Sequence, residues 1–96
     1  MALHDRYDLG RMRNEAAEQV YDRVERLLEE RNTICKCENC VLDLVAFTLN
    51  RVTPRFSTSV LGDLHPDEVK RKKLQVEIDL ALHAGIERVQ EHPHHD

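Results

Sequence analysis

The chain has 96 residues, which is less than the usual size of one domain and leaves room for one compact unit at most. Only 4% of the residues are aromatic and none is Trp, so a monomer would build a thin core that a metal, a disulfide or a second copy would reinforce. The net charge of −4 argues against general binding of duplex DNA, because that affinity comes from neutralising many phosphates.

The start of the chain and its cysteine content predict a cytoplasmic protein. Apolar runs are only a few residues long, so we expect no membrane span. Residues 1–6 contain neither an apolar core nor a small-residue cleavage site, and we therefore expect no secretory signal. In the cytoplasm, three cysteines are typical of metal ligands or reduced thiols rather than of disulfides.

A stripe of apolar residues predicts a first helix over residues 8–31. Its members recur at three- and four-residue steps, which places them on one side of a helix. Asn14 would cap an inner start, but the stripe begins before it, so we expect the helix to start near Asp8. The stripe consists of Leu9, Met12, Ala16, Val20, Val24, Leu27 and Leu28.

The second predicted helix, residues 38–51, is apolar on nearly all sides. Such a helix must be covered on nearly all sides, and the chain offers only two other helices for that purpose. We therefore expect an all-α homodimer in which this helix is central. Pro54 ends the helix by residue 52. The apolar residues are Val41, Leu42, Leu44, Val45, Ala46, Phe47 and Leu49.

A long ordered loop and a third helix complete the predicted fold. Residues 53–65 form the loop, and four apolar side chains are expected to hold it against the body: Phe56, Val60, Leu61 and Leu64. The third helix is predicted over residues 66–90, with Pro66 at its first position and Pro93 beyond its end. Its predicted buried side consists of Leu74, Ile78, Ala81, Leu82, Gly85, Ile86 and Val89.

Three cysteines within six residues predict a structural zinc site. Cys35, Cys37 and Cys40 stand where a loop enters the second helix, and this arrangement lets neighbouring sulfurs converge on one ion. The alternative is three reduced cysteines without a partner. A tetrahedral site needs a fourth ligand, for which we name His94 in the C-terminal histidine cluster. Other candidates are His4, His65, His83, His92, His95, Asp43 and water.

The segment 50–59 is a candidate anion-binding turn. Arg51 and Arg55 offer planar forks for phosphate oxygens, and Phe56 offers a stacking face. In the alternative interpretation Phe56 belongs to the core and both arginines are surface charges. The polar and bend-forming residues that would complete the site are Asn50, Pro54, Thr58 and Ser59.

Four consecutive cations, Lys70 to Lys73, fall in the first turns of the third helix, where the helix dipole favours anions. The run wraps around the helix, so two or three of these cations share a side with neighbouring elements, and we name Lys70 and Lys73 as ligand-binding residues. Beside Arg51 and Arg55 they predict a phosphate-binding patch, although a solvated face would explain the same run. The chain has no glycine-rich phosphate loop, no metalloprotease motif and no nucleophile motif, so we expect no enzymatic activity.

The cysteine cluster, the second helix and the proline-aromatic turn together resemble the late competence development protein family, ComFB. The pattern is a cysteine cluster, then Asp-x-x-Ala-x-x-Leu-Asn-Arg, then Pro-x-Phe-x-Thr, and its specific part spans residues 35–59. The matching residues are Cys35, Cys37, Cys40, Asp43, Ala46, Leu49, Asn50, Arg51, Pro54, Phe56 and Thr58.

The resemblance implies a small helical homodimer that holds zinc and binds a cyclic dinucleotide, cyclic di-GMP or cyclic di-AMP. Some members carry a further cysteine near the C-terminus, where this chain has His94 and His95 instead. We therefore expect a cyclic-dinucleotide receptor that signals to a protein effector. The main alternative is a metal-stapled interaction module in competence or DNA uptake without a nucleotide ligand. A small DNA-binding regulator and a thiol-based redox sensor are further alternatives.

Overall fold

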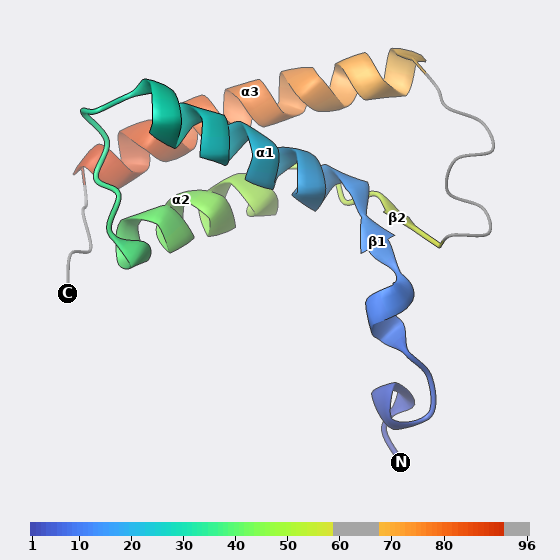
Figure 1. The fold of residues 1–96 in the computed structure, drawn as a ribbon. Helices are drawn as coiled ribbons and strands as arrows, with labels where there is room; N and C mark the ends of the chain where they lie inside the picture. The colour runs from blue at the N-terminus through green and yellow to red at the C-terminus, as the bar shows by residue number, and fades with distance from the viewer. Residues whose placement is uncertain (59–67, 92–96) are drawn as a thin grey trace.

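The computed structural model describes residues 1–58 and 68–91, and three helices contain most of them (Figure 1). Both α1 and α3 pack on α2, and the most extensive contact joins α2 to α3. The predicted helical architecture is confirmed, with the addition of one short two-stranded sheet. In chain order the elements are η1 (Leu3–Asp5), η2 (Leu9–Arg11), β1 (Arg13–Asn14), α1 (Glu15–Glu30), α2 (Glu38–Asn50), β2 (Phe56–Ser57) and α3 (Glu68–Glu91).

Helix α1 starts at Glu15, so the predicted start near Asp8 was wrong. The Asn14 side chain caps the helix by accepting a hydrogen bond from the Ala17 N–H at 3.4 Å. Upstream, the Asp8 carboxylate accepts from the Gly10 N–H at 3.1 Å, and this bond stabilises a 3₁₀ turn in place of a helix. The apolar stripe therefore overstated the length of α1, because its first two members, Leu9 and Met12, are exposed.

Helix α2 runs over the predicted residues and approaches α3 closely. Its core side buries Cys40, Leu44 and Thr48, and the Thr48 hydroxyl donates to the Leu44 carbonyl at 2.8 Å. At the crossing point α3 carries Gly85, where an added Cβ would lie 3.0 Å from Leu44 Cδ1 and 3.2 Å from Phe47 Cδ1. The two helices can therefore approach this closely only because residue 85 has no side chain.

Helix α3 buries the side that the sequence predicts. Six of the seven predicted positions are buried, and Ile86 is half-buried against the core. Pro66 and Pro93 lie outside the described residues. The buried apolar residues of the core are Ala16, Val20, Val24, Leu27, Ile34, Cys40, Leu44, Val52, Leu74, Ile78, Ala81, Leu82 and Val89.

Phe56 does not anchor a loop against the body, so that prediction was wrong. Its side chain is 64% exposed, and its main chain pairs with β1, directly before α1. Strand β2 lies antiparallel to β1, with Asn14 opposite Phe56 and Arg13 opposite Ser57. The other three predicted anchors, at positions 60, 61 and 64, lie outside the described residues.

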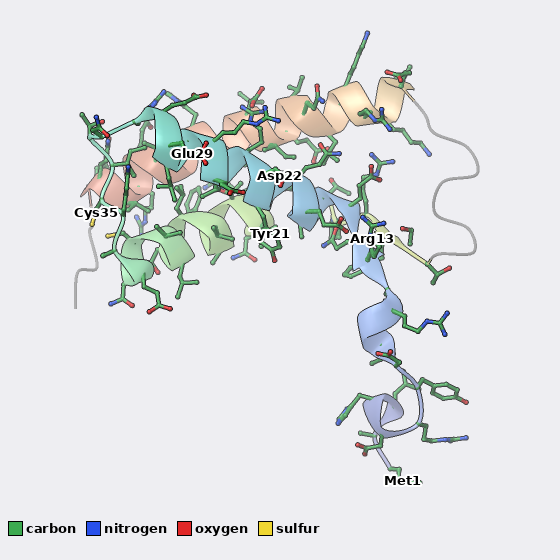
Figure 2. The ribbon with its side chains drawn as sticks, viewed as in Figure 1. Met1, Arg13, Tyr21, Asp22, Glu29 and Cys35 are labelled. Carbon is green, nitrogen blue, oxygen red and sulfur yellow. The ribbon has the colours of Figure 1, made fainter. Side chains whose placement is uncertain are left out.

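One apolar face of α2 is only partly covered by the described part of the chain. Leu42, Val45, Ala46 and Leu49 recur at helical spacing on the side opposite Leu44. Leu42 is 57% exposed, Ala46 is exposed, and the other two are half-buried. We call these four residues the α2 face. Tyr21 of α1, 52% exposed, projects on the side of α2 (Figure 2).

None of the helices described over residues 1–58 and 68–91 combines the length and apolar character needed to cross a bilayer.

The close crossing of α2 and α3 predicts that Gly85→Leu destabilises the fold by about 1–3 kcal/mol, because overpacking displaces Leu44 and Phe47. His83→Leu is the matched control, since it adds the same side chain to the same helix at an exposed position. Urea unfolding followed by circular dichroism measures both free energies of unfolding. Equal stability of the two variants would contradict the packing described at Gly85.

Candidate functional site

The three cysteine sulfurs converge on one point, as the sequence predicts. The Sγ atoms of Cys35, Cys37 and Cys40 lie within 4.8 Å of one another. Thiolates of a tetrahedral zinc site, with Zn–S bonds of about 2.3 Å, lie about 3.8 Å apart. Small side-chain rotations would therefore bring all three sulfurs onto one ion. The cluster can hold a metal ion.

The start of α2 positions these sulfurs. Cys37 is the N-cap residue, and its Sγ accepts a hydrogen bond from the Cys40 N–H at 3.4 Å. This bond and the positive end of the helix dipole favour negative charge on sulfur, which is the form that ligates metal. Cys40 is buried in the core, whereas Cys35 and Cys37 are half-buried. A metal held here would tie the loop before α2 directly to the core.

The far end of α3 lies beside this cluster. A hollow of about 200 Å³ separates Cys35 and Cys40 from Val89 and Gln90, and its walls are mostly apolar. The chain therefore leaves α3 close to the cysteines (Figure 1). Residue 94, our predicted fourth ligand, lies outside the described residues, as do the histidines at positions 65, 92 and 95.

Two alternative histidine ligands are placed away from the cysteines and have other partners. His4 lies in the projecting N-terminal segment, with its Nε2 3.3 Å from the Asp5 carboxylate. His83 is exposed on α3, with its Nε2 3.3 Å from the Glu87 carboxylate. Asp43 is half-buried on α2 and is not among the residues whose ligand atoms converge. Among the described residues, the group that could hold a metal is limited to the three cysteines.

Three of the predicted cations meet at a second hollow, at the other end of the molecule. Arg55 comes from the segment before β2, and Lys70 and Lys73 come from the first turns of α3. They line a hollow of about 200 Å³, and we call it the basic hollow. Its remaining lining residues are Thr53, Leu74 and Glu77.

Main-chain contacts with the start of α1 fix the position of Arg55. Its N–H donates to the Asn14 side-chain oxygen at 3.0 Å, and its carbonyl accepts from the Glu15 N–H at 2.8 Å. The Arg55 guanidinium lies 4.0 Å from the Glu15 carboxylate, with both side chains partly solvated. This ion pair is weak at such a distance and exposure, so Arg55 keeps its capacity to bind an anion.

Glu77 closes one side of the basic hollow and was not predicted as a site residue. Its carboxylate accepts from the Thr53 hydroxyl at 2.9 Å and from the Thr53 N–H at 3.1 Å. These hydrogen bonds, with a smaller contribution from the charge of Lys73, hold the pKa of Glu77 below its ordinary value of 4.5. Thr53 and Glu77 are 24 positions apart, and no sequence pattern predicts that they contact each other. The contact is evident in the folded structure alone.

The other predicted ligand residues do not line the basic hollow. The Arg51 guanidinium stacks on the Phe47 ring, 4.4 Å from its centroid, which directs it along α2. Asn50, Pro54 and Thr58 are exposed, as Phe56 is, and none of these four borders the hollow. Ser59 lies outside the described residues. The structure thus separates the two arginines that the sequence placed in one turn.

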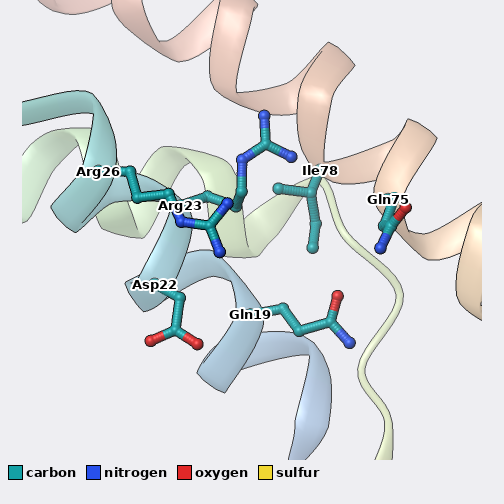
Figure 3. Close-up of a pocket in the computed structure, with 6 residues that line it drawn as sticks. All are labelled: Gln19, Asp22, Arg23, Arg26, Gln75 and Ile78. Carbon is teal, nitrogen blue, oxygen red and sulfur yellow. The ribbon is translucent and has the colours of Figure 1, made fainter. Parts of the chain in front are cut away.

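A third hollow, of about 390 Å³, lies between α1 and α3 and was also missed by the sequence analysis (Figure 3). Arg23 of α1 forms an ion pair with Asp79 of α3 and so joins the two helices beside it. Two arginines and one aspartate line it beside two glutamines, so its excess of cations is smaller than that of the basic hollow. Its lining residues are Gln19, Asp22, Arg23, Arg26, Gln75 and Ile78.

The contacts of Glu77 predict its titration. Since the folded protein favours the charged carboxylate, the stabilisation exists above the ordinary pKa of 4.5 and is lost as the pH falls through the lower folded value. Thr53→Val removes the hydroxyl donor and should raise the pKa of Glu77 toward 4.5, as an NMR titration of the side-chain carboxyl measures. Thr58→Val is the control and should leave that pKa unchanged, because Thr58 is exposed and away from the hollow. An unchanged value in Thr53→Val would contradict the assigned hydrogen bond.

Comparison with known proteins identifies the family. Neither the curated proteins nor the solved structures give a match to this chain. The family model "Late competence development protein ComFB" matches residues 13–93, which covers α1, α2, α3, the cysteine cluster and the basic hollow. The match extends over most of the chain and agrees with the motif in residues 35–59. The chain therefore belongs to the late competence development protein ComFB family.

Proposed function

We propose that this protein is a cytoplasmic, non-enzymatic receptor for a cyclic dinucleotide, built as a homodimer that zinc stabilises. The observation that carries the proposal is the convergence of Arg55, Lys70 and Lys73 on one hollow from two distant segments. Guanidinium and ammonium groups are the side chains that bind phosphate oxygens most strongly. Both lysines also lie near the N-terminal end of α3, where the helix dipole adds to the attraction for an anion.

The charge and the size of the basic hollow fit part of such a ligand. Three cations and the Glu77 carboxylate give it a formal charge of +2, which suits the phosphodiester groups of a cyclic dinucleotide. Its volume of about 200 Å³ is below the roughly 300–1,000 Å³ typical of a pocket for a whole small molecule. Each protomer would therefore bind one part of the ligand, and a two-fold dimer would bind a two-fold ligand.

The surface of the chain supports the homodimer. The protomer exposes 7489 Å², whereas a compact monomer of 11.2 kDa exposes about 5,700 Å². Residues 1–12, all of them exposed, contribute to this excess, and a standard interface would bury about 800 Å² on each partner. The α2 face supplies the apolar centre that such an interface needs.

Zinc is the metal that best suits the cysteine cluster. Thiolate ligands select zinc over the hard cations magnesium and calcium. Zinc also undergoes no redox reaction, which suits a structural site. The cluster lies at the opposite end of α2 from the segment that carries Arg55, so a metal there would not touch the basic hollow (Figures 1 and 2). We therefore assign zinc a structural role, in which it fastens the loop before α2 to a thin core.

Calorimetry with cyclic di-GMP and cyclic di-AMP tests the receptor proposal. We expect micromolar or tighter binding of at least one of them, and Lys73→Ala should weaken it at least tenfold because the variant removes a cation from the hollow. Lys72→Ala is the matched control, since it removes the same charge from the next residue of α3, which does not line the hollow. No heat with either nucleotide, or equal losses in both variants, would exclude the proposed site.

The zinc assignment predicts one equivalent of zinc per chain in protein purified without added metal. A strong chelator should lower the melting temperature, since the metal binds the folded state. His94→Ala should reduce zinc affinity, whereas His83→Ala should not, because His83 is placed beside Glu87. Mass spectrometry and a colorimetric zinc assay provide the readouts. Protein that is metal-free and keeps its melting temperature in the chelator would contradict the assignment.

A second candidate function is a metal-stapled protein-interaction module in competence or DNA uptake, without a nucleotide ligand. The exposed α2 face is the observation that favours it, since apolar patches of this kind often mark interaction sites. This alternative predicts that zinc and the fold are retained while neither nucleotide gives heat. The same calorimetry on zinc-loaded protein therefore decides between the two functions.

A further inference from the structure

The first twelve residues form an arm that stands clear of the three helices (Figure 1). Every residue of this arm is exposed, including five large apolar side chains: Met1, Leu3, Tyr7, Leu9 and Met12. The arm also precedes the segment matched by the ComFB family model, which begins at residue 13. Its apolar side chains contribute nothing to the core of its own protomer.

The arm nevertheless has a defined backbone. The Arg6 and Tyr7 N–H groups donate to the Leu3 carbonyl at 3.1 and 3.0 Å, and the Asp8 side chain caps the next turn. The Arg6 guanidinium lies 5.5 Å from the centroid of the Tyr7 ring. Hydrogen bonds thus hold the backbone of the arm in two short turns. The apolar side chains on these turns are not covered by a core.

The root of the arm directs it away from the body. Arg13 pairs with Ser57 in the small sheet, and the next residues are fixed by the contacts of Asn14 and Glu15 with Arg55. From this anchor the arm extends past α2, on the side away from α3 (Figures 1 and 2). The α2 face is on the side of α2 that α3 does not cover, so the arm and this face point to the same side of the molecule.

We propose that the arm of each protomer packs against the α2 face of a second copy of this chain. A partner seated on the α2 face would lie within the span of the arm, and two-fold symmetry would make the exchange reciprocal. The exchange would bury the apolar side chains of the arm and the exposed part of the α2 face in one interface. This inference rests on the proposed homodimer and names the arm as the segment that stabilises it.

The charge of the arm supports a protein partner over an anionic lipid surface. Its two arginines, Arg6 and Arg11, are balanced by Asp5 and Asp8, so it lacks the cluster of cations that attracts acidic headgroups. Leu3, Tyr7, Leu9 and Met12 supply apolar and aromatic contacts, as the centre of a homodimer interface does.

Sedimentation equilibrium on the full chain tests the proposal. The double variant Tyr7→Ser with Leu9→Ser should raise the dimer dissociation constant at least tenfold, which corresponds to about 1.4 kcal/mol. The matched control is Val76→Ser with Leu80→Ser, which removes two exposed apolar side chains from α3 and should leave the dissociation constant unchanged. Circular dichroism should show the same helix content in all three proteins.

The possible outcomes distinguish failure of the homodimer proposal from failure of the arm exchange. A chain that stays monomeric at all concentrations overturns the homodimer and the arm exchange together. A dimer whose dissociation constant is the same in the arm variant and the control overturns the arm exchange alone, and so does an equal rise in both variants.

Photo-crosslinking locates the contact. We expect p-benzoylphenylalanine in place of Tyr7 to crosslink to residues 42–49 of the other copy in a mixture of ¹⁴N- and ¹⁵N-labelled chains. Crosslinks with mixed isotope labels support the exchange between copies. Crosslinks confined to one label, or to residues outside α2, contradict it.

Discussion

The side chain of Asn14 is the contact on which the basic hollow depends. Its oxygen accepts hydrogen bonds from the Ala17 N–H, which starts α1, and from the Arg55 N–H, 41 residues further along the chain. A single carboxamide therefore ends the extended arm, begins a helix and fixes the segment that carries a cation. This bond acts together with the Glu15–Arg55 main-chain contact and the β1–β2 pairing to hold Arg55 at the hollow that Lys73 also lines.

The stability of the protomer depends on a small number of close contacts, because the core contains no large aromatic side chain. Its centre is the crossing of α2 and α3, where Gly85 lets Leu44 and Thr48 approach. The rest of α2 is apolar as well, but the described residues of the chain cover only part of it. A thin core of this kind explains why a metal at one end and a second copy on one face would both add stability.

The two candidate sites lie at opposite ends of the helical layer. The cysteines stand at the N-terminal end of α2, near the last turn of α3, whereas the basic hollow lies beside the first turns of α3. The roles proposed for the two sites differ accordingly. The metal would preserve the shape of the molecule, and the cations would bind the ligand. A ligand bound by both protomers would then act on the interface that the α2 face and the arm provide.

Patterns among neighbouring residues were enough to predict the extent of α2, the buried side of α3 and the convergence of Cys35, Cys37 and Cys40. Helical periodicity and short spacing set these features, and both can be read along the chain. The folded chain was needed to show that Asn14 rather than Asp8 starts α1 and that Phe56 is exposed. It also decided that Arg55 and not Arg51 meets the lysines, and that Glu77 binds Thr53. Each of these outcomes depends on contacts between residues that are distant in sequence or on competition between local hydrogen bonds. Neither can be predicted from the periodicity of apolar residues along the chain.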